Sequence, residues 1–394
     1  MKFKSTIDAL SELLNYVAPI VPQKSTVLVL QYLNFNLSGN TLSVIATNEE
    51  ISILKKIEVE GLEDGSVLVP SKKFNDIIKS IGKGGEVTFT CDTNSFEIEF
   101  KYGKGKFKLK GIDSQEYISL EGLFENELTN ISNILEKVAE GELFAKFEEK
   151  LFAKLTDRTL FAVSTEDYKP AMTGVFFQFR ENQLTVAATD GYRLNRYIHS
   201  TEENAYPKVF DVVIPSSSLE LLRKIDAEMI MSVLEEDDSP KYLRFDFENT
   251  ILTTRIINEK FPPYETIIPN DYTFTALVPL NELISATKRV SLTANTVSKL
   301  MILNFANNQL TLNTQDDETG EFAEESLPCE IQFEKFEIGV KYDYFLQSLQ
   351  HLYYDGTSED VLELRFNDPA KAFIICPKNE YETFIMLNMP VRYK

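Results

Sequence analysis

Residues that build metal centres and disulfide frameworks are scarce in this sequence. Its 394 residues include three cysteines, Cys91, Cys329 and Cys376, and two histidines, His199 and His351. An odd number of widely spaced cysteines is typical of a cytosolic protein with free thiols in its core. Neither histidine has a cysteine or carboxylate set at metal-ligand spacing around it. We therefore expect a cytoplasmic protein without a metal or other cofactor.

The sequence also lacks long apolar runs and the common catalytic motifs. No run approaches the roughly 20 residues of a transmembrane helix, and Asp8 and Glu12 in the N-terminal helical pattern argue against a signal peptide. There is no Gly-rich phosphate loop, HExxH motif or nucleophile elbow. Asp190-Gly191 could begin a metal loop, but the further ligands are missing beside it. We expect no active site, and hence no enzyme.

Positive charge is in deficit, because 61 acidic residues outnumber 40 basic ones and the net charge is −21. Taken over the whole chain, this balance argues against a nucleic-acid partner, which needs clustered Lys and Arg. A total does not show distribution, however, and an acidic protein can carry one basic face. Charge alone leaves the question open.

What the sequence does contain is a pattern that occurs three times. The motif Asn-x-Leu-(Ser/Thr)-(Val/Leu) begins at Asn40, Asn182 and Asn308. Its alternation of apolar and polar residues predicts half-buried strands. After the middle copy, Asp190-Gly191 predicts a hairpin turn. Only that copy continues as Asp-Gly-Tyr-Arg-Leu, so we expect the repeated scaffold to be specialised for partner binding there.

Two independent markers agree on the spacing of the repeats. Leu42, Leu184 and Leu310 are 142 and 126 residues apart, and a second set of helix positions is 145 and 125 apart (Phe74, Leu219 and Tyr344). Such a long period indicates a triplicated domain, because solenoid repeats run roughly 20–50 residues. We predict an α+β protein with three domains, at residues 1–125, 126–270 and 271–394. An acidic helical insertion at about 126–142 accounts for the longer first offset.

Each predicted domain holds two amphipathic helices and several antiparallel strands. No Gly/Ser-rich linker separates the domains, which predicts rigid packing from edge to edge. The helices are expected at residues 3–20, 71–81, 144–163, 217–225, 279–292 and 342–352.

Four short motifs give the chain a family resemblance. Val-Pro-Ser-Lys-Lys-Phe at 69–74, Ala-Thr-Asp-Gly-Tyr-Arg-Leu at 188–194, Phe-Pro-Pro-Tyr at 261–264 and Asn-Met-Pro-Val-Arg at 388–392 resemble those of the bacterial sliding clamps. Those proteins are the beta subunits of the replicative DNA polymerase III holoenzyme. The resemblance implies a homodimeric ring that encircles double-stranded DNA without sequence preference. It further implies helices lining the hole and a pocket for peptide motifs of DNA polymerase and clamp loader subunits.

Basic residues on the predicted helices fit a DNA-facing surface. Lys146, Lys150, Lys154 and Arg158 are four residues apart and would share one helical face. Contact of such a lining with phosphates would be sequence-independent and salt-sensitive. The alternative is a set of solvated helix faces, which neighbouring acidic residues favour and the resemblance disfavours. The other candidates are Lys24, Lys72, Lys73, Lys79, Arg223, Lys224, Lys288 and Arg289.

The resemblance also implies the residues of the partner-peptide pocket. A groove that contains Met and Pro and is rimmed by Arg and Thr suits short peptide anchors. Two departures affect partner preference: Tyr192 stands where His is common in the family, and Tyr393-Lys394 lengthens the closing segment. Met172, Leu194 and Ile267 could equally be ordinary core. The implied set is Met172, Thr189, Gly191, Tyr192, Arg193, Leu194, Pro262, Ile267, Met389, Pro390, Val391 and Arg392.

A lysine-rich strand is the candidate subunit interface. Residues 106–110 alternate lysine with Phe107 and Leu109. As an edge strand it could pair with a second subunit while its lysines discourage promiscuous pairing, and the resemblance implies contact near Val290. A closed-off surface strand is the alternative. Two rivals to the clamp also stay open: an interaction scaffold that never encircles DNA, and an enzyme with an unrecognised site.

Overall fold

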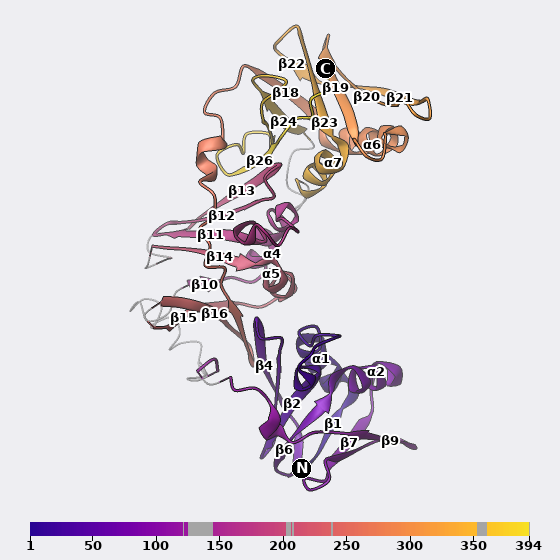
Figure 1. Cartoon of the computed structure of the whole chain (residues 1–394), viewed down its shortest axis with the longest axis vertical. Helices are drawn as coiled ribbons and strands as arrows, with labels where there is room; N and C mark the ends of the chain where they lie inside the picture. Colours follow the sequence, from indigo (N-terminus) through magenta and orange to yellow (C-terminus); the bar gives the residue numbers. More distant parts are fainter. Residues whose placement is uncertain are drawn as a thin grey trace. The chain divides into compact units, whose positions relative to one another are not determined.

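The computed structural model describes residues 1–120, 122–124, 145–201, 206, 209–237, 239–352 and 361–393. The predicted insertion at 126–142 and Lys394 lie outside these residues. The chain divides into two compact units, the first formed by Met1–Glu149 with Ala227–Ile256 and the second by Lys150–Asp226 with Ile257–Lys394 (Figure 1). The predicted domain limits remain a prediction, because the units follow sheet pairing and cut through the middle third of the chain.

Within its described residues, the first unit packs α1 (Ile7–Val17) and α2 (Ser71–Ile81) on antiparallel sheets. The five-stranded sheet has the order β5 (Glu60–Glu63), β1 (Lys2–Thr6), β7 (Glu86–Cys91), β8 (Glu97–Tyr102) and β9 (Gly105–Lys110). The eight-stranded sheet has the order β10 (Ala145–Phe147), β15 (Met229–Glu236), β16 (Ser239–Phe247), β17 (Thr250–Arg255), β4 (Ile51–Glu58), β3 (Thr41–Thr47), β2 (Tyr32–Ser38) and β6 (Gly65–Pro70). Short 3-10 helices lie at Leu28–Gln31 and Ser114–Glu116.

Capping and apolar spacing explain the two helices of this unit. The Thr6 hydroxyl accepts a hydrogen bond from the Ala9 amide at 3.1 Å and begins α1. On α2, Phe74 and Ile78 are buried one turn apart, whereas the lysines of that helix are exposed. The Phe74 ring meets Phe35 edge-on, with ring centroids 5.6 Å apart, and so joins α2 to the core under β2.

The second unit is built in the same way from one large sheet, one small sheet and four helices (Figure 1). Its nine-stranded sheet has the order β14 (Phe210–Pro215), β11 (Gly174–Arg180), β12 (Gln183–Thr189), β13 (Arg193–Ser200), β26 (Phe384–Asn388), β25 (Phe373–Pro377), β24 (Val361–Phe366), β18 (Phe274–Pro279) and β22 (Glu330–Ile331). The four-stranded sheet has the order β21 (Glu321–Pro328), β20 (Gln309–Asp316), β19 (Leu300–Ala306) and β23 (Lys335–Lys341). The helices are α4 (Leu151–Asp157), α5 (Ser216–Leu222), α6 (Leu280–Val290) and α7 (Tyr342–His351), with 3-10 turns at Leu160–Ala162, Pro170–Met172, Tyr264–Ile267 and Ser291–Thr293.

The three copies of the sequence pattern occupy the same place in three equivalent strand sets. They form β3, β12 and β20, and each is the second strand in the orders β4-β3-β2-β6, β13-β12-β11-β14 and β21-β20-β19-β23. The last strand of each set leads directly into a helix, respectively α2, α5 and α7. The predicted hairpin at Asp190-Gly191 is confirmed, because it joins β12 to β13. The repeat is therefore a structural unit.

Two of the three strand sets are extended at the first strand of the orders given above, β4 and β13, by a strand from the next third of the chain. In the first unit β4 pairs with β17, and in the second unit β13 pairs with β26, both antiparallel. Each joint links a strand from one third of the chain to a strand from the next. The corresponding strand of the last set, β21, ends its sheet, and β9 ends the five-stranded sheet, within the part of the chain that the structure describes.

The predicted helix at 144–163 is wrong. Residues 145–147 instead form β10, which pairs with β15, and α4 begins only at Leu151. Lys150 separates the two elements with a left-handed φ of 65°, which ends any continuous helix there. Pairing of β10 with β15 thus determines the structure of residues 145–147, although the spacing of the lysines predicts a helix. The predicted helix at 217–225 also ends early, at Leu222.

Candidate functional site

The turn between β12 and β13 is held by its own side chains. The Asp190 carboxylate accepts hydrogen bonds from the amides of Tyr192 at 2.8 Å and Arg193 at 2.9 Å. The Thr189 hydroxyl donates to the Arg193 carbonyl at 2.6 Å and accepts from the Gly191 amide at 3.0 Å. Gly191 has a φ of 91°, a conformation that side chains rarely tolerate. These bonds fix a rigid turn that presents Tyr192 outward.

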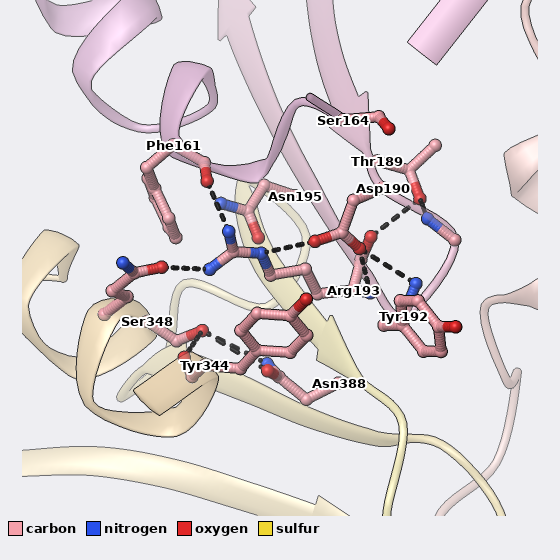
Figure 2. A network of polar contacts seen from close by, with 12 residues as sticks. Phe161, Ser164, Thr189, Asp190, Tyr192, Arg193, Asn195, Tyr344, Ser348 and Asn388 are labelled. Carbon is pink, nitrogen blue, oxygen red and sulfur yellow. Dashed lines mark hydrogen bonds and ion pairs between the residues drawn. The ribbon is translucent and has the colours of Figure 1, made fainter. Parts of the chain in front are cut away.

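Arg193 links this turn to two distant segments (Figure 2). Its guanidinium donates to Asp190 Oδ2 at 3.0 Å, to the Phe161 carbonyl at 2.6 Å and to Gln347 Oε1 at 2.5 Å. The ring of Tyr344 lies 4.5 Å from the guanidinium carbon, measured to its centroid. A planar fork with several fixed donors suits this position, because each nitrogen finds a different acceptor.

Arg193 and Thr189, which were predicted to rim the pocket, have largely buried side chains, and their place in the pocket stays a prediction. Arg193 is only 7% exposed, and Leu194 is fully buried. For Leu194 the core interpretation is therefore correct. The sequence could not distinguish these roles, since the acceptors of Arg193 come from Phe161 and Gln347, 32 and 154 residues away. The buried side chains of Thr189, Arg193 and Leu194 therefore support the turn from the interior of the protein.

The surface of this region is formed by large apolar side chains. Tyr192 and Met389 are 59% and 45% exposed, and the Met389 amide donates to the Tyr192 carbonyl at 2.8 Å. Ile267 is also exposed, so the core interpretation fails for it, whereas Met172 and Pro262 are partly buried. Exposed apolar groups that flank a rigid turn are typical of a protein interaction site.

Residues 389–393, which we call the closing segment, leave the large sheet after β26 and reach β23. The Val391 amide donates to the Gly339 carbonyl at 2.8 Å. The Tyr393 hydroxyl donates to Glu337 Oε1 at 2.7 Å, and burial together with this carboxylate raises the pKa of Tyr393 to about 12. Pro390 and Val391 are partly buried and Arg392 is exposed. A pocket of about 710 Å³ lies against residues 391–393.

Sequence reasoning missed an aromatic and cationic group beside the turn. Tyr168 is highly exposed, and its hydroxyl and Lys169 both contact Glu166. Lys341 lies over the Tyr344 ring, with its amine 4.7 Å from the ring centroid. No local pattern marks these residues, because they come from separate loops and a strand end. They widen the candidate surface around Tyr192.

The candidate DNA-facing residues fall into three groups: buried or partly buried, paired with acids, and exposed. Arg158 is buried, with its guanidinium carbon 4.4 Å from the Tyr197 ring centroid, which does not favour its predicted contact with DNA. Others on or beside the helices are engaged by acids: Lys146 with Glu228, Lys150 with Asp226, Arg223 with Asp157 and Glu220, and Arg289 with Glu325. Lys154 is partly buried near Tyr197. Exposed lysines without a recorded ion pair among the described residues are Lys24, Lys72, Lys73, Lys79, Lys224 and Lys288.

The candidate subunit strand is confirmed as an edge. It forms β9, where Phe107 and Leu109 are partly exposed between exposed lysines. Lys106 pairs with Glu99 on β8 at 2.5 Å, which together with Lys101 lowers the Glu99 pKa to about 2. Val290 is only 2% exposed in the single chain, so in this conformation its side chain is covered and does not face a second subunit. Nearby Leu292 and Phe322 are instead exposed.

Two kinds of feature are absent from the part of the chain that the structure describes. Within them, no group of three or more His, Cys, Asp or Glu side chains is placed to hold a metal ion. No helix among the same residues has the length and apolar character needed to cross a membrane.

Known proteins resemble this chain along its whole length. Three models of DNA polymerase III beta subunit domains match it: the N-terminal domain at residues 1–121, the central domain at 146–263 and the C-terminal domain at 265–392. The beta sliding clamp of Bacillus subtilis is 26% identical, with 100% of both chains covered, and that of Vibrio cholerae is 23% identical, again with 100% of both covered.

Solved structures show the same fold. A Pseudomonas aeruginosa DnaN sliding clamp bound to griselimycin has a TM-score of 0.86 at 21% identity, and the Bacillus subtilis clamp has 0.86 at 24%, each with 100% of both chains covered. At these identities the structures establish the fold alone. The three domain models together span nearly the entire sequence, in order. The chain belongs to the family of the DNA polymerase III beta subunit, the bacterial sliding clamps.

Proposed function

We propose that this sliding clamp closes into a head-to-tail homodimeric ring around double-stranded DNA and holds DNA polymerase and other DNA enzymes for processive work. It would act by topology and tethering, without catalysis, and in the cytoplasm where the chromosome lies. The membership in the clamp family supports the function, and the strand joints of the fold support the ring.

The single observation that supports the ring concerns strand pairing: the first two strand sets each pair with a further strand, and the third set does not among the described residues. Two of three equivalent joints are made within the chain, β4 with β17 and β13 with β26. The strands left over are β21 and β9, which both end their sheets among the described residues. If β21 of one copy pairs with β9 of a second copy, and the reverse, all joints become alike and the ring closes. Closure also removes both exposed strand edges.

An apolar side chain on β21 supports this pairing. Phe322 lies opposite Gln315 on β20, as Leu194 lies opposite Thr189 and Ser52 opposite Thr47, so the three positions are equivalent. Ser52 and Leu194 are 4% and 0% exposed, because a neighbouring strand covers them. Phe322 is 58% exposed. Its exposure is expected if the covering strand comes from the partner subunit.

Charge is also complementary between the two free edges. The alternate residues of β9 that point away from its apolar face are lysines, whereas β21 carries the exposed Glu321 and Glu324. Leu292, which is 81% exposed beyond α6, adds apolar area beside β21. Such complementarity fixes orientation more than it raises affinity. It favours pairing of unlike edges over pairing of β9 with itself.

DNA contact is assigned to the exposed helix lysines. On α2, Lys72, Lys73 and Lys79 extend into solvent and can meet phosphates without reading sequence. Loose contact of this kind permits sliding, and it weakens as salt rises. Lysines already paired with acids would contribute less, since an ion pair must break first.

Peptide motifs of partners are assigned to the surface around Tyr192 and Met389. Exposed Met and Tyr side chains adapt to varied apolar anchors, and the rigid turn beneath them limits the entropy lost on binding. The related clamp of Pseudomonas aeruginosa binds griselimycin, and we propose that griselimycin binds this surface too. Tyr192→Ala and Met389→Ala variants should each weaken binding. Ala substitution at the exposed Val209, on the edge of the same sheet, is the control.

Retention on circular DNA tests the clamp directly. Protein loaded onto nicked circular DNA by a clamp loader should stay bound through gel filtration at high salt and be lost after the circle is linearised. A Phe322→Asp variant should be monomeric by analytical ultracentrifugation and should not be retained. Equal retention on linear and circular DNA would refute topological binding. A stable dimer that is never retained on any DNA would indicate the scaffold instead.

A further inference from the structure

We propose that Tyr393 is a positioning residue for the partner-peptide pocket. It fastens the closing segment to β23 and thereby holds Met389 beside Tyr192. This inference rests on the proposed peptide-binding function of that surface.

The closing segment is added to β23 in the register of an antiparallel strand. Val391 contacts Gly339, and two residues further on Tyr393 contacts Glu337, two residues back. Opposite directions along the two segments are the mark of antiparallel addition. Because β23 ends the four-stranded sheet among the described residues, the closing segment covers an otherwise open edge.

Gly339 shows how closely the segment is seated. A Cβ atom built on Gly339 would lie 2.6 Å from Tyr393 Cδ1 and 2.6 Å from the Val391 carbonyl oxygen, far inside van der Waals contact. The glycine is thus required by close approach of the segment. A glycine within a strand commonly marks such a place. The Tyr393 ring itself occupies the space that any larger side chain would need.

Beyond Met389 the closing segment is only partly buried. The pocket of about 710 Å³ is lined on one side by Val391, Arg392 and Tyr393. Its other wall is formed by Phe274, Lys335, Phe336, Glu337 and residues 368–370. One flank of the segment therefore faces a cavity rather than packed core. The hydrogen bonds of Val391 and Tyr393 consequently carry much of the attachment.

Release of the closing segment would change the position of Met389 in the binding surface, because Pro390 connects the two. Its ring restricts φ, so the backbone on either side moves as a stiff joint. Met389 precedes this joint and is tied to Tyr192 by one hydrogen bond of 2.8 Å. If the segment is detached for part of the time, the apparent affinity for a ligand falls in proportion to the attached fraction.

The test compares variants that change the hydrogen bond between Tyr393 and Glu337 or the contact of Tyr393 with Gly339. Tyr393→Phe keeps the ring over Gly339 and removes the hydroxyl, and Glu337→Gln keeps an acceptor for it. Loss of one hydrogen bond of ordinary strength predicts about 3- to 10-fold weaker griselimycin binding by Tyr393→Phe, measured by calorimetry. Glu337→Gln should lose less. Gly339→Ala, which leaves Tyr393 intact but blocks its seat, should weaken binding at least as much.

Hydrogen exchange separates positioning from a general loss of stability. In Tyr393→Phe the Val391 amide should exchange faster, while amides of the β12–β13 hairpin keep their wild-type protection. Unchanged griselimycin affinity together with unchanged Val391 exchange would overturn the proposal. Wild-type protein that fails to bind griselimycin would overturn the pocket assignment, and the positioning role with it, whatever happens to Val391.

Discussion

Replacement of Arg193 by alanine tests whether the turn is held by one buried guanidinium. The substitution removes three hydrogen bonds, to Asp190, Phe161 and Gln347, and the stacking on Tyr344. It also leaves the Asp190 carboxylate buried with only backbone donors. Breaking a buried pair by removing one partner costs about 3–5 kcal/mol. We expect a loss of that size in the free energy of unfolding.

A second arginine in the same unit provides a matched control. Arg180 pairs with Asp211 at 2.6 Å, but both side chains are more than one third exposed. Exposed pairs contribute about 0–1 kcal/mol. Arg180→Ala should therefore cost at most about 1 kcal/mol. Arg193→Lys should fall between the two alanine variants, because an ammonium can retain Asp190 but cannot reach all three acceptors as a fork.

Urea unfolding of the full chain, followed by circular dichroism, measures the difference. Griselimycin titration under native conditions shows whether the turn still presents Tyr192. We expect Arg193→Ala to lose both stability and binding, and Arg180→Ala to lose neither to a comparable degree. An Arg193→Ala variant as stable as Arg180→Ala would refute the assignment of Arg193 as the support of the turn.

Three further predictions concern other parts of the molecule. Lys108→Glu should weaken self-association in analytical ultracentrifugation, and an equimolar mixture with Glu324→Lys protein should restore it if β9 meets β21. Lys79→Gln should lower the salt dependence of DNA binding by about one unit of slope, because one phosphate contact is lost. Burial lowers the pKa of His351 below its ordinary value. The contribution of neutral His351 to the free energy of unfolding is therefore complete above about pH 6.5 and is lost as pH falls through the folded pKa. His351→Phe should flatten the pH dependence of the urea midpoint. His199→Phe is the control.

Elements with strong local patterns could be predicted from the sequence. The α2 helix was expected at residues 71–81 and is found at Ser71–Ile81, because Phe74 and Ile78 define an apolar stripe and Pro70 bars an earlier start. The strands β3 and β20 alternate in burial along most of their length, so their periodicity sufficed, whereas β12 is buried on both faces and only its first residues alternate in sequence. In these places local preference and tertiary packing agree.

Elements whose state depends on distant partners could not be predicted. The lysines at 146, 150 and 154 imitate one helical face, yet Ala145–Phe147 pairs with Met229–Met231 far along the chain. At the site, exposure decides function: Arg193 and Tyr192 are neighbours in sequence, but one is buried under the turn and the other projects from it. Phe322 is exposed, although Ser52 and Leu194 at the equivalent positions of the other repeats are buried. No local sequence pattern predicts this difference.

The turn that differs most in sequence among the three repeats is built in the same way in the first two, and the third, which is two residues longer, keeps one of its hydrogen bonds. In the first copy, Asn48 accepts hydrogen bonds from the amides of Glu50 and Ile51, as Asp190 does from the corresponding residues of the second. Thr47 donates to the Ile51 carbonyl, as Thr189 does to that of Arg193. In the third copy the corresponding Asp316 accepts from the Glu318 amide.

The specialisation of the middle copy therefore resides in side chains rather than in backbone shape. At the position of Arg193 the first copy has Ile51, buried at a strand joint, and the third has Glu321, exposed at an open edge. A side-chain-capped turn can carry any of these residues, because its hydrogen bonds use the preceding Thr and Asx positions. One scaffold can thus form a closed joint, a supported binding surface or an edge for a second subunit, according to a single residue beyond the turn.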